Sequence, residues 1–231
     1  MYDMKKIGLI GGTSWHSTIV YYRLINEMVG AKIGAQANPE LLIYSLNIEI
    51  MREQDKEKIN KKYLEISRTL EAAGAKALVI CANTPHMVFD FVQPQIDIPI
   101  LHIAEAIGKE ARERNLKTLG LLGNRPTMTG DFIPSFLKRN YGMETIIPDG
   151  EFIDQNHHYV SNELTRGIFS EEARSFFQEQ MQLLKGKGAE GIILGCTELP
   201  MLIETEEAGL PLIATTQLHA KMASDFILSE H

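Results

Sequence analysis

Residues 74–87 read GAKALVICANTPHM, and residues 188–201 read GAEGIILGCTELPM. The two stretches align without a gap at an offset of 114 residues, so that Gly74 falls on Gly188 and Met87 on Met201. Each contains a short apolar run that ends in polar residues, the pattern of a buried strand that turns into a helix. The repeat predicts two similar units built around the same strand-to-helix turn, although chance likeness between buried strands is an alternative.

A second repeated pair, IGLIGG at 7–12 and LGLLGN at 119–124, keeps the same order along the chain. Continuous Ile, Leu and Val runs followed by helical patterns indicate parallel sheets covered on both faces. The sequence therefore predicts an α/β protein with two similar parallel-sheet, Rossmann-like domains related by a pseudo-two-fold axis. We expect the domains to span 1–115 and 116–231. The last helix of the first domain and the final helix, 215–229, are the segments that can cross to the other domain.

The strands are expected at the apolar runs 6–12, 40–46, 76–82, 117–123 and 190–196, four of which belong to the repeats. Weaker candidates are 99–101, 143–147 and 211–214. Helices are expected at 55–73 and 170–186. In the first of these, Ile59, Tyr63, Ile66 and Leu70 recur at spacings of three and four, which lays one apolar stripe along a helix.

Composition excludes several classes of function. The 231 residues carry 23 Lys and Arg against 30 Asp and Glu, a net charge of −7 that argues against nucleic acid as the main partner. No apolar run reaches the roughly 18 residues of a membrane-spanning helix. Two cysteines in the whole chain indicate a reducing compartment, so we expect a cytoplasmic protein.

The residues that follow the strands are the best candidates for chemistry, because parallel sheets bind ligands beyond the carboxyl ends of their strands. Two similar domains would bring these ends together around one cleft. Cys196 ends a buried strand before an expected helix at 198–204. The free N–H groups and positive dipole end of a helix lower the pKa of a thiol, which then serves as nucleophile or general base. A buried, inert cysteine is the alternative.

The first copy of the repeat supplies Asn83 and Thr84, two neutral hydrogen-bonding side chains at a strand end. They are suited to hold a carboxylate, or simply to cap a helix. The repeat pairs Ala82 with Cys196 and Cys81 with Gly195. Because side chains alternate along a strand, Cys81 is expected to lie in the core.

The loops Gly11–Ser14 and Gly123–Thr127 form the other repeated pair. Gly12, Thr13, Asn124 and Thr127 allow close approach of a ligand and offer polar groups to a carboxylate, or serve only in tight turns. Neither loop matches a nucleotide-binding fingerprint. Arg166 precedes a glycine at an expected helix end, where it stabilises the helix dipole or reaches a substrate carboxylate.

Together and in this order, the motifs resemble those of the aspartate/glutamate racemase family. The resemblance rests on IGLIGGTSWHSTIVYYRLIN at the start, ANTPH at 82–86, GLLGNRPTM at 120–128, GIILGCTELPML at 191–202 and TTQLHA at 215–220. It implies two α/β domains, often dimeric, with the active site between them. It also implies amino-acid racemisation without pyridoxal phosphate, other cofactor or metal.

In typical members two thiols flank the α-carbon, and one removes the proton while the other returns a proton to the opposite face. The resemblance makes Cys196 the catalytic cysteine of the second half. It places Asn83, Thr84, Thr127 and Thr197 at positions that hold the α-carboxylate and amino group, and Arg166 near a position that supplies a cation for a side-chain carboxylate.

Ala82 departs from this pattern, because it stands where the family has its first cysteine. Alanine has no proton to exchange, so either the protein was altered at this position, or water or Thr84 serves that face, or the activity is not racemisation. Despite this departure, the resemblance implies a cofactor-independent amino-acid racemase for aspartate or glutamate, with Cys196 as the remaining base, a small acid as its partner and a homodimeric assembly. A lyase or decarboxylase that uses one thiol, and a small-acid binding protein that has lost turnover, are the alternatives.

Overall fold

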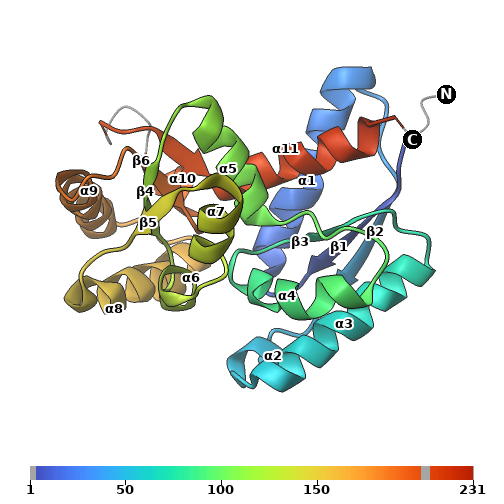
Figure 1. Ribbon diagram of the computed structural model, residues 1–231, viewed down its shortest axis with the longest axis horizontal. Coiled ribbons are helices and arrows are strands. Elements are labelled where there is room, and N and C mark those ends of the chain that lie inside the picture. Colours follow the sequence, from blue (N-terminus) through green and yellow to red (C-terminus); the bar gives the residue numbers. More distant parts are fainter. Residues whose placement is uncertain (1–3, 204–208, 231) are drawn as a thin grey trace. The chain divides into compact units, whose positions relative to one another are not determined.

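The computed structural model describes residues 4–203 and 209–230, and its contacts divide the chain into two units (Figure 1). Unit 1 comprises Met1–His102 and His219–His231, and unit 2 comprises Ile103–Leu218. By this grouping the helix that follows the first repeated half belongs to unit 2, and most of the final helix belongs to unit 1. The limits of independently folding domains, at 1–115 and 116–231, stay a prediction.

Unit 1 is built on a parallel sheet of three strands in the order β2-β1-β3. Strand β1 (Ile7–Gly11) lies at the centre, between β2 (Leu41–Ser45) and β3 (Leu78–Ile80). Gly11 pairs with Ser45 and Ile10 with Ile80, so the strands end nearly in step. The weak candidate at 99–101 is reduced to a single bridge between Leu78 and Ile100.

Helices cover both faces of this sheet (Figure 1). Helices α1 (Trp15–Ile33) and α11 (Thr215–Leu228) pack on one face, where Leu9, Ile25 and Ala223 are fully buried. Helices α3 (Lys56–Ala72) and α4 (Phe89–Val92) pack on the other face. The apolar stripe predicted for 55–73 is confirmed, because all four of its residues are buried in this second core. Between these elements lie α2 (Glu49–Arg52) and the 3-10 helices η1 (Thr84–Val88) and η2 (Gln93–Gln95).

Unit 2 contains four parallel strands in the order β5-β4-β6-β7. They are β5 (Glu144–Ile146), β4 (Thr118–Leu122), β6 (Gly191–Leu194) and β7 (Leu212–Ala214). Helices α5 (Ile103–Glu113) and α7 (Pro134–Tyr141) cover one face. Helices α8 (Gly150–His158), α9 (Glu171–Gly186) and α10 (Leu199–Leu202) contribute to the core on the other.

The remaining elements of unit 2 are α6 (Arg125–Thr129), the π-helical turn η3 (Tyr159–Glu163) and the 3-10 helix η4 (Leu164–Arg166). Two parallel, helix-covered sheets confirm the predicted fold class. The strands lie at the runs predicted from the sequence, including the weaker ones at 143–147 and 211–214.

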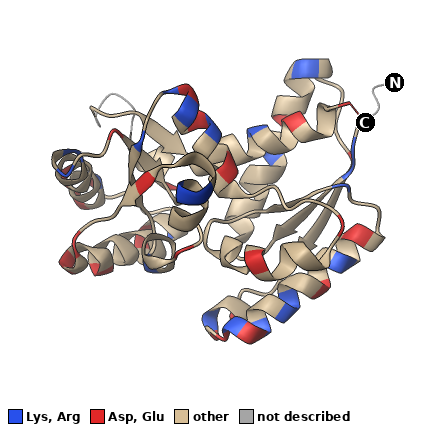
Figure 2. Cartoon of the chain, in the orientation of Figure 1, with Lys and Arg blue, Asp and Glu red and all other residues tan. Residues whose placement is uncertain are grey.

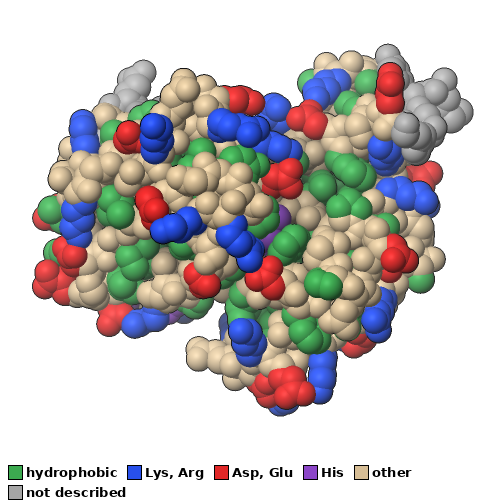
Figure 3. All heavy atoms as spheres, in the orientation of Figure 1, with side chains coloured by type: hydrophobic (Ala, Val, Ile, Leu, Met, Phe, Trp, Pro, Cys, Tyr) green, Lys and Arg blue, Asp and Glu red, His purple; other side chains and the backbone are tan. Residues whose placement is uncertain are grey.

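The charges of the chain lie on its surface in mixed sign. Lysines and acids are interspersed along α3, where Lys61 pairs with Glu57 at 2.5 Å and Lys62 with Glu65 at 2.9 Å (Figure 2). The face seen in Figure 3 likewise carries both signs among apolar side chains. Among the described residues, no helix has the length and apolar character needed to cross a membrane.

Candidate active site

The strand ends of unit 2 bring three polar loops to one edge of its sheet. Leu122 pairs with Leu194, and Leu194 pairs with Ala214, so β4, β6 and β7 end at the same level. Directly beyond them come 123–127, 195–198 and the start of α11. The hydroxyl of Thr215 donates to the carbonyl of Leu194 at 3.0 Å and so fastens α11 to the end of β6.

Cys196 lies at this edge, two residues beyond β6, and is only 8% exposed. Its Sγ lies 2.9 Å from Oε2 of Glu198, so the thiol donates a hydrogen bond to the carboxylate. Burial raises the pKa of Cys196 well above its usual value, and the negative charge and hydrogen bond of Glu198 raise it further. The backbone N–H groups of Glu198 and Leu199 oppose this change without reversing it.

This geometry corrects the prediction that a helix start lowers the pKa of Cys196. Helix α10 has only four residues and begins at Leu199, so its end is a weak source of positive potential. The adjacent carboxylate and the loss of water outweigh it. The structure therefore has a protonated thiol beside a proton acceptor, rather than a free thiolate.

Thr127 and Asn124 close the loop beside Cys196. Asn124 is the N-cap of α6, because its side chain accepts the N–H of Thr127 at 2.9 Å. Thr127 is fully buried, and a Cβ built at Gly195 would lie 3.0 Å from its methyl group and 2.8 Å from the carbonyl of Leu122. Gly195 therefore lets the end of β6 approach β4, next to the half-buried Thr197.

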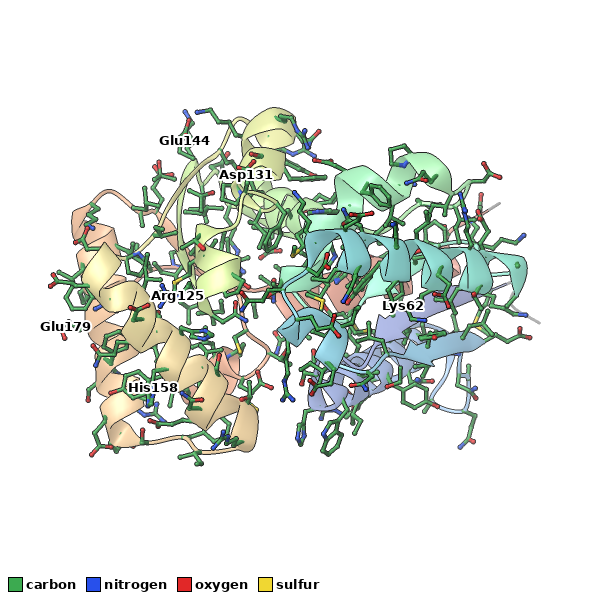
Figure 4. All side chains as sticks on the ribbon, turned by 90° about the horizontal axis from the view of Figure 1, so that it is seen from below. Lys62, Arg125, Asp131, Glu144, His158 and Glu179 are labelled. Carbon is green, nitrogen blue, oxygen red and sulfur yellow. The ribbon has the colours of Figure 1, made fainter. Side chains whose placement is uncertain are left out.

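Two arginines near these loops, Arg125 and Arg166, have different surroundings. The guanidinium of Arg125 forms an ion pair with Asp154 of α8, and its backbone N–H points to Nδ1 of His157 at 3.4 Å. Figure 4 shows Arg125, the first residue of α6, and His158, the last residue of α8. Arg166 is exposed at the end of η4, where Gly167 follows with a φ of 76°. The expected helix end at Arg166 is thus present.

The strand ends of unit 1 carry the other candidates. Gly12 has a φ of 91°, and a Cβ there would lie 2.1 Å from the carbonyl oxygen of Leu46, so the turn requires glycine. The hydroxyl groups of Thr13 and Tyr63 are 3.0 Å apart. Ser14 caps α1 by accepting the N–H of Ser17.

Ala82 and Asn83 lie in the turn between β3 and η1, and Thr84 follows them. Ala82 is half-buried, Asn83 is buried, and Thr84 is the first residue of η1. Cys81 is 1% exposed, its carbonyl accepts the hydroxyl of Ser17 at 2.8 Å, and burial raises the pKa of its thiol. The prediction that Cys81 is a core residue is confirmed.

Two further groups near these loops are not among the site residues that the sequence predicts. The carboxylate of Glu198 accepts the hydrogen bond of the Cys196 thiol, and its position two residues after the cysteine was the available signal. His86 is fully buried and directs Nδ1 to the carbonyls of Ala82 and Asn83 at 2.9 and 3.2 Å. His86 belongs to the ANTPH stretch on which the family resemblance rests, but its contacts depend on the turn of η1 and could not be predicted from the sequence.

The Nδ1 atoms of the adjacent histidines of α8 each lie near a polar side chain four residues further along the chain. His157 meets the hydroxyl of Ser161 at 3.1 Å, and His158 meets the amide of Asn162 at 3.0 Å. Across residues 4–203 and 209–230, no group of three or more His, Cys, Asp and Glu side chains is arranged to bind a metal ion.

Comparison with known proteins shows the family of this chain. The family model described as Asp/Glu/hydantoin racemase matches residues 10–223. The chain belongs to this racemase family. The match includes both repeated strand ends, those at Ala82 and at Cys196.

Three relatives can be aligned with this chain over nearly the whole length of both proteins. A broad specificity amino-acid racemase of Bacillus subtilis, RacX, is 25% identical over 223 residues, which cover 93% of this chain and 95% of that protein. A solved candidate Asp/Glu racemase from Yersinia pestis is 36% identical, with a TM-score of 0.92 over 98% of this chain and 100% of that one. An aspartate racemase homologue from Pyrococcus horikoshii is 32% identical, with a TM-score of 0.86 over 98% and 100% of the two chains. The family supports amino-acid racemase activity.

Proposed function

We propose that this protein moves a proton at the α-carbon of aspartate or glutamate, with Cys196 as the thiol that touches the reacting proton. The observation that carries the proposal is the 2.9 Å hydrogen bond from Sγ of Cys196 to Oε2 of Glu198. A thiol of raised pKa is a poor base until its proton is taken, and a carboxylate at this distance can take it.

The proposed step conserves every proton. The S–H proton of Cys196 passes to the carboxylate of Glu198, and the thiolate so formed removes the Cα proton of the amino acid. The electron pair of the broken C–H bond is delocalised into the substrate carboxylate. Return of a proton from Cys196 restores the original enantiomer, whereas a proton from a donor on the other face gives the opposite one.

The sequence repeat supplies no proton donor for the opposite face of the α-carbon. The repeat pairs Cys196 with Ala82, and a methyl group neither gives nor takes a proton. We propose that water or the hydroxyl of Thr84 serves this face, so exchange of the Cα proton is faster than inversion. The same observation favours two alternatives, a lyase or decarboxylase that protonates a carbanion from one side and a small-acid binding protein without turnover.

Substrate recognition is proposed to use the polar groups at the strand ends. Asn83, Thr84, Thr127 and Thr197 are suited to the α-carboxylate and amino group, with Gly12, Thr13 and Asn124 shaping the loops. Arg166 is the proposed cation for the side-chain carboxylate. Arg52 is a poorer candidate, because Oε1 of Glu49 lies 2.5 Å from its guanidinium.

The test of the proposal is isotope exchange. Wild-type protein incubated with L-aspartate or L-glutamate in D₂O is expected to introduce deuterium at Cα, and Cys196→Ser is expected to abolish it. Failure of the wild type to exchange any amino acid would refute the proposed function. The family resemblance also supports a homodimer, which sedimentation equilibrium tests separately.

A further inference from the structure

Three buried histidines meet in unit 1. His86 and His219 have no exposed surface and His102 is 2% exposed. The ring centroid of His86 lies 4.8 Å from that of His102 and 5.3 Å from that of His219. Burying an imidazole costs free energy unless its nitrogens are hydrogen-bonded. The hydrogen bonds of this histidine cluster therefore indicate what the buried rings do.

The contacts of His86 fix where its proton lies. Nδ1 is within hydrogen-bond distance of two carbonyl oxygens, those of Ala82 and Asn83, and carbonyl oxygens only accept. Nδ1 therefore carries the hydrogen. The ring holds the two peptide groups that begin the strand-end loop, directly at the position that the repeat pairs with Cys196.

His219 has the opposite tautomer. Its Nε2 lies 2.6 Å from the carbonyl oxygen of Leu101 and therefore carries the hydrogen, while its Nδ1 accepts from the hydroxyl of Tyr21 at 2.8 Å. Tyr21 is fully buried on α1. His219 thus joins α11 to α1 and to the segment after β3, and its ring braces that of His86.

Two of the three histidines lie where the chain passes between the two units. The chain leaves unit 1 after His102 and enters it again at His219. His86 therefore contacts the residues of unit 1 that stand at both crossings.

We propose that His86 is a positioning residue, which holds the backbone of Ala82 and Asn83 through Nδ1–H and is itself held by His102 and His219. Its effect on turnover rests on the proposed function, but its tautomer and its hold on the loop do not. Burial lowers the pKa of His86 to about 4, although the carbonyls of Asn83, Ala82 and Leu101 favour the cation. Burial is the main cause that lowers the pKa of His219 to about 3, so both rings are neutral at pH 7.

Two amide substitutions separate positioning from mere space filling. The side-chain N–H of asparagine in His86→Asn falls near the place of Nδ1, whereas that of glutamine in His86→Gln falls near the place of Nε2. We expect His86→Asn to retain Cα exchange within about ten-fold of wild type, and His86→Gln to lose about 10²-fold, the effect of a misplacement near 1 Å. Equal losses in the two variants would overturn the proposal.

Imidazole ¹⁵N NMR of the wild type supplies a readout that needs no turnover. We expect His86 as the neutral Nδ1–H tautomer and His219 as the neutral Nε2–H tautomer at pH 7. His86 found as Nε2–H, or charged, would overturn the proposal even if both variants fail to fold. If the wild type exchanges no substrate, the proposed function fails alone. Positioning is then tested by backbone amide hydrogen exchange at 83–86, which we expect to be faster in His86→Gln than in His86→Asn, and equal rates would overturn it.

Discussion

Replacing the carboxylate beside the catalytic thiol has two effects of opposite sign. In wild type the thiol of Cys196 donates to Glu198 across 2.9 Å, and the negative charge of Glu198 helps to hold the pKa of Cys196 above its usual value. Glu198→Gln keeps the size of the side chain and removes that charge. We expect the pKa of Cys196 to fall and the exchange reaction to slow, because the proton acceptor is gone.

The distance sets the size of the effect. Two unit charges about 3 Å apart repel by about 5 kcal/mol at an effective dielectric constant of about 20, and this repulsion opposes the thiolate in wild type. Even partial release of it gives at least about a ten-fold rise in thiolate-dependent alkylation near pH 7.5. Cα exchange is expected to fall by about 10²- to 10⁴-fold, the usual contribution of one acid/base group.

Alkylation is measured with iodoacetamide, because a neutral reagent does not itself respond to the lost charge. Mass spectrometry follows Cys196 and Cys81 separately, and Cys81 is the internal control. Glu198→Asp, which keeps a carboxylate, is the matched variant and should show a smaller rise in alkylation. Slower alkylation of Cys196 in Glu198→Gln, or exchange at the wild-type rate, would refute the reasoning.

Three further predictions concern the other residues of the account. Ala82→Cys is expected to raise racemisation at least about 10²-fold over wild type, and Ala82→Ser far less, by chiral chromatography of aspartate and glutamate; an alanine form that inverts as fast as Ala82→Cys disproves the two-thiol account. In wild type a thiol reagent should label Cys196 much faster than Cys81, and a dicarboxylate should protect it; equal labelling removes the assignment. His86 has a pKa of about 4 when folded and about 6.5 when unfolded. The free energy of unfolding is therefore unaffected by His86 above pH 6.5, and it falls by about 3 kcal/mol as the pH is lowered to 4, because the unfolded chain binds the proton first. Urea titrations should show a shallower acid slope in His86→Asn, and an unchanged slope contradicts the burial argument.

The architecture could be predicted from the sequence because its signals are local. Runs such as those at 76–82 and 190–196 are apolar through their length and end in polar residues, which identifies buried parallel strands without any knowledge of their neighbours. The periodicity of 55–73 likewise predicted which face of α3 is buried. The repeat extended these local signals to a statement about two similar units.

The electrostatic state of the site could not be predicted in this way. The sequence places Cys196 before a helix, but only the structure shows that α10 is short and that Glu198 turns back to the thiol. Burial and a single side-chain rotamer thus reversed the expected direction of the pKa change. Gly12 is a related case, because its contact with Leu46 comes from a segment more than thirty residues away.

The histidine cluster escaped prediction for the same reason. His86, His102 and His219 are far apart in the chain, and each alone is a common core residue. Their meeting depends on the return of α11 to unit 1, which the sequence left open.

Proton exchange at Cα tests the central claim most directly. Wild type and Cys196→Ser are each incubated in D₂O with L-aspartate and L-glutamate, and NMR and chiral chromatography follow deuteration and inversion together. The account predicts deuteration that outpaces inversion in wild type and disappears in Cys196→Ser. Deuteration that survives the loss of the thiol, or inversion that keeps pace with deuteration in wild type, would contradict it.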